Sequence, residues 1–156
     1  QPEIVEMVKK NPKNILVGYI DMGHLSTEEN GIQHTKTFIF DKKSFYLGSA
    51  NCDWRAYTEV VEIGMFGVNM VTAAQDLLKI YEMYWYTSYL KNSVPIPWPK
   101  SYDTIFNENH PMVIGKENIP LYFSSSPHIF VNTGRLNDAK ALVNVINNTT
   151  SGIIRI

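Results

Sequence analysis

The spacing of apolar residues in the first third of the chain predicts one helix and one buried strand. Residues 3–10 (EIVEMVKK) have the apolar spacing of an amphipathic helix, and Asn11-Pro12 ends it. The apolar, β-prone run at 14–20 (NILVGYI) predicts a buried strand. The Gly, Ser, Asn and Glu residues of 21–33 predict a loop.

A β-hairpin is predicted next. Residues 34–40 (HTKTFIF) form its first strand, a polar turn follows at 41–43, and Ser44 to Leu47 returns as the second strand. Because side chains alternate along a strand, four of them share one face of the first strand: His34, Lys36, Phe38 and Phe40. Gly48 and Ser49 end the hairpin.

The pattern then changes from strand to helix and to an extended connector. Residues 58–68 predict a strand, and residues 70–90 have helical spacing with no Gly or Pro between them. Three alternating prolines in 94–99 (VPIPWP) exclude a helix there.

The last third predicts two short strands within 111–123 around Gly115, a helix at 135–147, and a buried strand at 152–156. The order of elements predicts an α/β fold, an α/β sandwich with a second α/β unit that begins near the C-terminal end. We therefore divide the chain into three parts: 1–93, a connector at 94–126, and the start of a second unit at 127–156.

Composition limits the class of protein. With 156 residues, 44% of them hydrophobic, the chain has enough apolar material for the core of one domain. A formal net charge of -1 gives no basic excess, although an active cleft can be locally basic in a neutral protein. The single cysteine, Cys52, excludes an internal disulfide and is expected to be a small buried residue. The first residue is Gln1 and no signal segment follows it, so we expect any targeting segment to lie upstream.

Six residues of the hairpin region fit the pattern HxKx₄Dx₆GSxN: His34, Lys36, Asp41, Gly48, Ser49 and Asn51. Six fixed residue types match by chance at roughly 10⁻⁸ per starting position, so the pattern is a strong signal.

These residue types suit a phosphodiester. Lys36 supplies a compact positive charge, and the imidazole of His34 can attack phosphorus or protonate a leaving oxygen. Ser49 and Asn51 can donate hydrogen bonds to phosphate oxygens, although Ser49 is also an ordinary turn residue. Gly48 permits close backbone approach, and Asp41 is expected to support the hairpin without touching substrate.

A carboxylate on the next strand can fix the tautomer of His34. Glu59 and Glu62 both fall in 58–68, and the apolar neighbours of Glu62 predict that it is buried and needs a partner such as His34. The alternative is that Glu62 is a carboxylate at the rim. Trp54 and Arg55 are candidates to line the cleft by stacking and phosphate contact, and a packed Trp54 is the commoner outcome.

No metal and no cofactor are expected. The four histidines (His24, His34, His110 and His128) lack ligand spacing, and neither a nucleophile elbow nor a Walker sequence occurs.

The run HTKTFIFDKKSFYLGSAN resembles the HKD motif of the phospholipase D superfamily. Its continuation GSANCDWR, the segment TEVVEIG and the stretch GRLNDAKALVNVI are similar to the animal lysosomal phospholipase-D-like 5′ exonucleases and the poxvirus nicking-joining enzymes. The resemblance runs from about Ile20 onward and implies most of the first lobe of a phospholipase-D-type α/β sandwich plus the start of the second.

The resemblance implies a site without metal in which two HKD motifs meet, so a missing C-terminal half would supply the second. It implies that His34 forms a phosphohistidine, that Lys36 and Asn51 bind phosphate with support from Ser49, and that Glu62 orients the histidine. Substrates would be single-stranded DNA or RNA degraded from the 5′ end, or phospholipids. An endomembrane or lysosomal location is implied as well.

Two other hypotheses remain open at this point. The chain is a non-catalytic relative that binds membranes or partners, or it pairs as a homodimer in which each subunit gives one histidine. A second HxKx₄D motif in the C-terminal half favours the enzyme. The residues 1–156 by themselves are expected to be inactive or nearly so.

Overall fold

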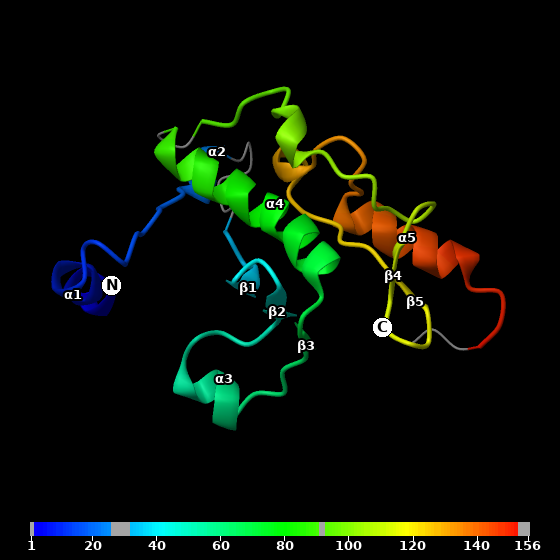
Figure 1. The fold of residues 1–156 in the computed structure, drawn as a ribbon, viewed down its shortest axis with the longest axis horizontal. Helices are drawn as coiled ribbons and strands as arrows, with labels where there is room; N and C mark the ends of the chain where they lie inside the picture. Colours follow the sequence, from blue (N-terminus) through cyan, green and yellow to red (C-terminus); the bar gives the residue numbers. More distant parts are fainter. Residues whose placement is uncertain (1, 26–31, 91–92, 153–156) are drawn as a thin grey trace. The chain divides into compact units, whose positions relative to one another are not determined.

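The computed structural model describes residues 2–25, 32–90 and 93–152. They fall into two compact units, the first made of 1–33 with 84–94 and the second of 34–83 with 95–156. Helix α4 (Val71–Tyr89; labelled in Figure 1) belongs to both units. Its residues 71–83 belong to the second unit and its residues 84–89 to the first. Among the described helices, none has the length and apolar character needed to cross a membrane.

The first unit begins with α1 (Pro2–Lys10), which confirms the predicted N-terminal helix. Pro2 occupies the first helical turn, where its missing N–H is not needed, and Glu3 lies in the same turn. Lys9 and Lys10 lie in the last turn, and Lys10 pairs with Glu6 at 2.7 Å. A short helix, α2 (Met22–Leu25), follows.

The prediction of a buried strand at 14–20 is wrong. These residues adopt no regular structure, and Leu16, Val17 and Tyr19 are exposed by 68%, 56% and 74%. A strand needs a neighbour for its backbone hydrogen bonds, and no described strand pairs with this segment. Gly18 instead lies against the end of α4, where Ser88 and Trp85 leave no room for a larger side chain.

The second unit contains an antiparallel sheet of three strands in the order β1-β2-β3: β1 (Lys36–Phe40), β2 (Ser44–Gly48) and β3 (Gly64–Gly67). The predicted hairpin is confirmed. The strand predicted at 58–68 is shorter than expected, because α3 (Trp54–Thr58) takes up the first part of the segment. Asp53 starts this helix by accepting hydrogen bonds from the backbone N–H groups of Arg55 and Ala56.

The hairpin turn has an unusual backbone. Asp41 and Lys42 have φ values of 51° and 57°, and the N–H of Lys43 donates to the carbonyl of Phe40 at 3.0 Å. Two successive positive φ angles match the right-handed twist of the strands, as in type I′ turns. Asp tolerates this conformation well, whereas Lys pays the steric cost of its Cβ.

Replacing Lys42 with glycine should therefore raise the free energy of unfolding by about 1 kcal/mol. Chemical denaturation of the variant and the parent chain measures the difference. Lys43 is the matched control, because it does not have a positive φ. Lys43→Gly should not raise the free energy of unfolding. An equal increase in that free energy in both variants would contradict the explanation.

One face of the sheet carries the core of this unit. The ring of Phe45 is fully buried and meets Phe123 edge-on, with 5.5 Å between ring centroids. Gly67 leaves space for that ring, since a Cβ there would overlap it. Helix α4 confirms the prediction for 70–90 and adds five buried apolar side chains: Ala73, Ala74, Leu77, Ile80 and Met83.

The remaining elements follow the connector. The 3₁₀ turn η1 (Lys100–Tyr102) precedes two paired strands, β4 (Met112–Ile114) and β5 (Ile119–Leu121), which confirm the strands predicted around Gly115. A second 3₁₀ turn, η2 (His128–Phe130), leads to α5 (Asp138–Asn148), which confirms the last predicted helix. The strand predicted at 152–156 lies almost entirely outside the described residues. The division of the chain at 94–126 stays a prediction.

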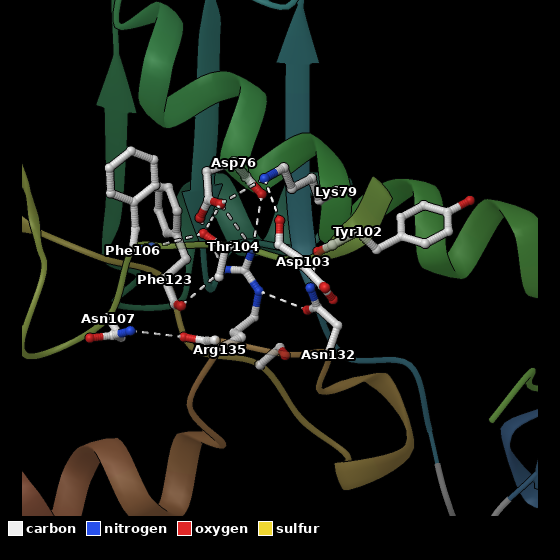
Figure 2. A network of polar contacts seen from close by, with 12 residues as sticks. Asp76, Lys79, Tyr102, Asp103, Thr104, Phe106, Asn107, Phe123, Asn132 and Arg135 are labelled. Carbon is white, nitrogen blue, oxygen red and sulfur yellow. Dashed lines mark hydrogen bonds and ion pairs between the residues drawn. The ribbon is translucent and has the colours of Figure 1, made fainter. Parts of the chain in front are cut away.

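A buried ion pair joins α4 to the segment before α5 (Figure 2). The guanidinium of Arg135 donates to both carboxylate oxygens of Asp76, at 3.0 and 3.2 Å, and the two side chains are 0% and 1% exposed. Arg135 also donates to the carbonyl of Phe123 at 3.0 Å and to the side chain of Asn132 at 3.3 Å. Thr104 adds a hydrogen bond to Asp76 at 2.5 Å. Both charged groups therefore have hydrogen-bond partners from several segments of the chain, and buried charges require such partners.

Candidate active site

His34 lies two residues before β1, and its side chain is exposed. Lys36 opens β1 and faces Gly48 in the strand register. The ammonium of Lys36 donates a hydrogen bond to the backbone carbonyl of His34 at 2.7 Å. The two residues of the HxK pattern are therefore held together through the backbone at the start of the hairpin.

Ser49 closes the loop between β2 and β3. Its backbone N–H donates to the carbonyl of Ile63 at 2.9 Å, and its hydroxyl oxygen accepts from the N–H of Ile63 at 3.0 Å. The same hydroxyl donates to the carboxylate of Glu62. We call these contacts among Ser49, Glu62 and Ile63 the serine clasp. Residues 50–62, which include α3, extend from it beyond the ends of the strands (Figure 1).

Removing the hydroxyl in Ser49→Ala should speed hydrogen exchange at the amide of Ile63 about five-fold, which corresponds to the loss of roughly 1 kcal/mol. The amide of Ser49 itself is the internal control, since its bond to the Ile63 carbonyl uses only backbone atoms. Exchange measured by mass spectrometry or NMR that leaves Ile63 unchanged would show that the clasp does not hold the loop.

A shallow pocket of about 560 Å³ lies where β2 ends and β3 begins. Seven residues line it: His34, Leu47, Gly48, Ser49, Ile63, Gly64 and Met65. Three residues of the sequence pattern thus share one hollow. Gly48 and Gly64 face each other across the strands, and the ring of Tyr46 occupies the space that a Cβ at either position would need. A larger residue at Gly48 would displace that ring.

The other three residues of the pattern, Lys36, Asp41 and Asn51, lie outside the pocket lining. Asn51 is exposed two residues beyond Ser49, and its carbonyl accepts from the N–H of Asp53 at 2.9 Å. Asp41 lies in the hairpin turn, at the end of β1 opposite to His34. A strand of five residues is about 17 Å long, so Asp41 is remote from the pocket.

Glu62 was expected on a strand beside His34. The structure corrects its position, because β3 begins only at Gly64 and Glu62 precedes it, half-buried, in the serine clasp. Glu59 is the C-cap of α3. The hydrogen bond that the structure shows for Glu62 runs to Ser49, so its role in orienting His34 stays a prediction.

The loop held by the serine clasp presents polar and aromatic groups to solvent. The expectation of a packed tryptophan is wrong, since Trp54 is 66% exposed, and Cys52 is exposed as well. Trp54 begins α3 and Cys52 lies two residues before it, and a helix of five residues is too short to bury either side chain. Arg55 is also exposed and reaches back to Asp53 at 3.5 Å.

Two ionisable groups of this loop are shifted. Partial desolvation acts to raise the pKa of Asp53, but hydrogen bonds from the N–H groups of Ala56 and Arg55, together with the Arg55 charge, bring it below its usual value. Desolvation raises the pKa of Tyr57, and a hydrogen bond with Cys52 adds to that effect. The ionised Asp53 therefore stabilises α3 above its ordinary pKa, and this contribution is lost as the pH falls through the lowered value.

A histidine and a lysine on one hairpin, joined to a serine-lined pocket, define a candidate phosphodiester site on an α/β scaffold, and the predicted α/β class is confirmed. Residues 6–155 match the family model described as the PLD-like domain of PLD3/4. The chain therefore belongs to this family of phospholipase-D-like domains, as the sequence resemblance predicted.

The curated relatives agree with the family model. The chain is 42% identical over 139 residues to the 5′-3′ exonuclease PLD3 of Homo sapiens and of Bos taurus, across 88% of this chain and 28% of each relative. It is 37% identical over 136 residues to the virion nicking-joining enzyme of Monkeypox virus, across 86% of this chain and 31% of that protein. The chain thus spans less than a third of the length of these relatives.

Proposed function

We propose that residues 34–62 supply one half of the active site of a phosphodiesterase that acts through a phosphohistidine. The observation that carries this proposal is the pocket in which His34 lies together with Ser49 and Gly48, three positions of one sequence pattern. Family membership supports the same chemistry.

The first chemical step uses His34 as the nucleophile. A ring nitrogen attacks phosphorus and forms a P–N bond, while the bond from phosphorus to the leaving oxygen breaks. A second histidine, supplied by polypeptide outside residues 1–156, donates a proton to that oxygen. The same group then takes a proton from water, whose oxygen attacks phosphorus and releases His34.

Phosphate binding falls to the residues around the pocket. Lys36 now donates to a neutral carbonyl, and a charged phosphate oxygen is a stronger acceptor for the same ammonium. Asn51 is exposed, and its amide makes no side-chain contact with the described residues, so it can donate as well. Ser49 contributes through its position in the serine clasp, with Glu62 as the positioning residue behind it.

We propose single-stranded nucleic acid, degraded from its 5′ end, as the substrate class, as the sequence resemblance implies. The names 5′-3′ exonuclease and nicking-joining enzyme both describe action on nucleic acid. A phospholipid is the second candidate, and one observation favours it. Ile63, which lines the pocket, and Val61, two residues before it, are exposed by 82% and 100% and present apolar surface to a bound molecule or a lipid layer.

The proposal is tested with the full-length product of the gene, assayed on 5′-hydroxyl single-stranded DNA and on phosphatidylcholine vesicles. We expect cleavage of the DNA into short products without added metal, and little release from the lipid. The polypeptide 1–156 alone should be nearly inactive because it lacks the proton donor. Hydrolysis of phosphatidylcholine but not of DNA would show that the substrate is a phospholipid. Absence of both activities would favour a non-catalytic relative.

A further inference from the structure

Tyr46 lies in β2 beside a row of residues that borders the pocket. That row crosses the three strands and consists of one lysine and two glycines: Lys36, Gly48 and Gly64. Tyr46 belongs to the next row and is two residues before Gly48, so its side chain is on the same face of the sheet as Lys36. The two glycines leave an open space on that face.

The ring of Tyr46 fills this space and brings its hydroxyl to the wall of the pocket. A Cβ at Gly64 would lie 2.7 Å from the phenolic oxygen, and one at Gly48 would lie closer still. The oxygen is therefore directly above the two glycines. Both glycines line the pocket together with His34.

Packing explains the ring of Tyr46 but not its hydroxyl. The ring contacts Phe38, with 5.9 Å between the ring centroids, and the side chain is half-buried. The hydroxyl makes no hydrogen bond with any of the described residues. A phenylalanine would fill the same space, and a partly buried tyrosine usually has a partner for its O–H. The hydroxyl is thus available to a molecule bound in the pocket.

We propose that the hydroxyl of Tyr46 donates a hydrogen bond to a non-bridging oxygen of the bound phosphodiester and so positions the phosphorus for attack by His34. This inference rests on the proposed function, because it needs a phosphodiester at His34. A neutral phenol is a hydrogen-bond donor, and its bond to a charged phosphate oxygen is stronger than a bond to a neutral acceptor. Tyr46 would then act beside Lys36, which supplies the positive charge.

The pattern HxKx₄Dx₆GSxN does not include this residue. Tyr46 falls within the six unspecified positions between Asp41 and Gly48. The alternation of side chains along β2 places it on the face of Lys36, and the glycines at 48 and 64 provide the space that lets its hydroxyl reach the pocket.

Replacing Tyr46 with phenylalanine in the full-length gene product removes the hydroxyl and keeps the ring. We expect kcat/KM on 5′-hydroxyl single-stranded DNA to fall roughly 10- to 100-fold, as for a lost hydrogen bond to a charged group, with no change in thermal unfolding. Tyr122 is the matched control, because it is half-buried in the same unit and lies outside the pocket lining. Tyr122→Phe should stay within about two-fold of the parent. A Tyr46→Phe variant as active as the parent would overturn the inference.

Phosphorothioate DNA distinguishes a contact with the substrate from a packing role. Sulfur accepts hydrogen bonds poorly, so sulfur in place of the oxygen that faces Tyr46 should slow cleavage by the parent. In Tyr46→Phe this slowing should be about five-fold smaller for one diastereomer and unchanged for the other. The same slowing in the two proteins for both diastereomers would give Tyr46 a packing role only and would overturn the inference.

Failure of the proposed function gives a different result. A parent protein that hydrolyses neither DNA nor phosphatidylcholine overturns the proposed function and this inference together. An active parent in which His34→Asn is inactive and Tyr46→Phe is fully active overturns this inference alone. If the parent hydrolyses only phosphatidylcholine vesicles, the same loss in Tyr46→Phe is expected on the vesicles, because both substrates contain a phosphodiester.

Discussion

Replacing His34 with asparagine should reduce phosphodiester hydrolysis at least about 10³-fold in a protein that holds both halves of the active site. Asparagine keeps the approximate size of the side chain and cannot form the P–N bond. Because His34 is exposed and precedes β1, the change should leave the fold intact. Initial rates on 5′-hydroxyl single-stranded DNA measure the loss, and thermal unfolding of the variant checks its stability.

His110 is the matched control for this prediction. It is exposed, belongs to the same unit and lies outside the pocket lining. The hydrogen bonds shown for it involve only its backbone, so His110→Asn should leave the rate within about two-fold of the parent. Equal losses in both variants would point to damage of the fold, and a fully active His34→Asn variant would exclude His34 as the nucleophile.

Breaking the buried pair of Asp76 and Arg135 should have the largest effect on stability. Arg135→Met leaves the carboxylate of Asp76 buried without its bidentate partner, and removal of one member of such a pair costs about 3–5 kcal/mol. Lys79, at 3.8 Å from Asp76, recovers little because its side chain is 31% exposed and does not form the fork. Urea denaturation of the variant and the parent measures the difference.

Two further variants isolate the cause of that loss. Arg55→Met removes an arginine from an exposed pair with Asp53 and should change stability far less. The double change Asp76→Leu with Arg135→Met removes both charges and should cost clearly less than the sum of the two single changes. Additive losses would mean that packing, and not the stranded charge, sets the cost.

Local sequence signals were sufficient for the hairpin and for helix α4. The hairpin has alternating side chains and a polar turn, and α4 has nineteen residues with helical spacing and no glycine or proline. The HxKx₄D pattern could be read in the same way, because its residues lie within one hairpin. These features depend on near neighbours in the chain, which is why the sequence predicted them.

The features that the sequence analysis missed depend on tertiary contacts. The run at 14–20 is β-prone, yet it finds no strand to pair with among the described residues and lies against α4 through Gly18. The ion pair of Asp76 and Arg135 joins residues 59 apart. Its sequence signal was an aspartate in a largely apolar helix, which indicates a buried charge but does not identify the partner.

One local signal in the sequence, an N-cap residue, indicates the short helix that the strand prediction for 58–68 left out. Asp53 follows two residues after Asn51. Aspartate is a preferred N-cap residue, so Asp53 indicates the start of the short helix α3. That helix shifts the start of β3 to Gly64 and moves Glu62 into the serine clasp. The sequence left Ser49 as either a phosphate ligand or an ordinary turn residue, and the structure shows that its hydroxyl closes the loop through Glu62 and Ile63.

The central claim, that His34 is the nucleophile, is tested most directly by trapping the covalent intermediate. The full-length protein is mixed with 5′-hydroxyl single-stranded DNA, quenched within milliseconds at alkaline pH, digested and analysed by mass spectrometry. We predict a phosphorus-linked adduct on the peptide that contains His34, absent from His34→Asn and present in His110→Asn. An adduct on a different histidine, with His34 unmodified during active turnover, would contradict the claim.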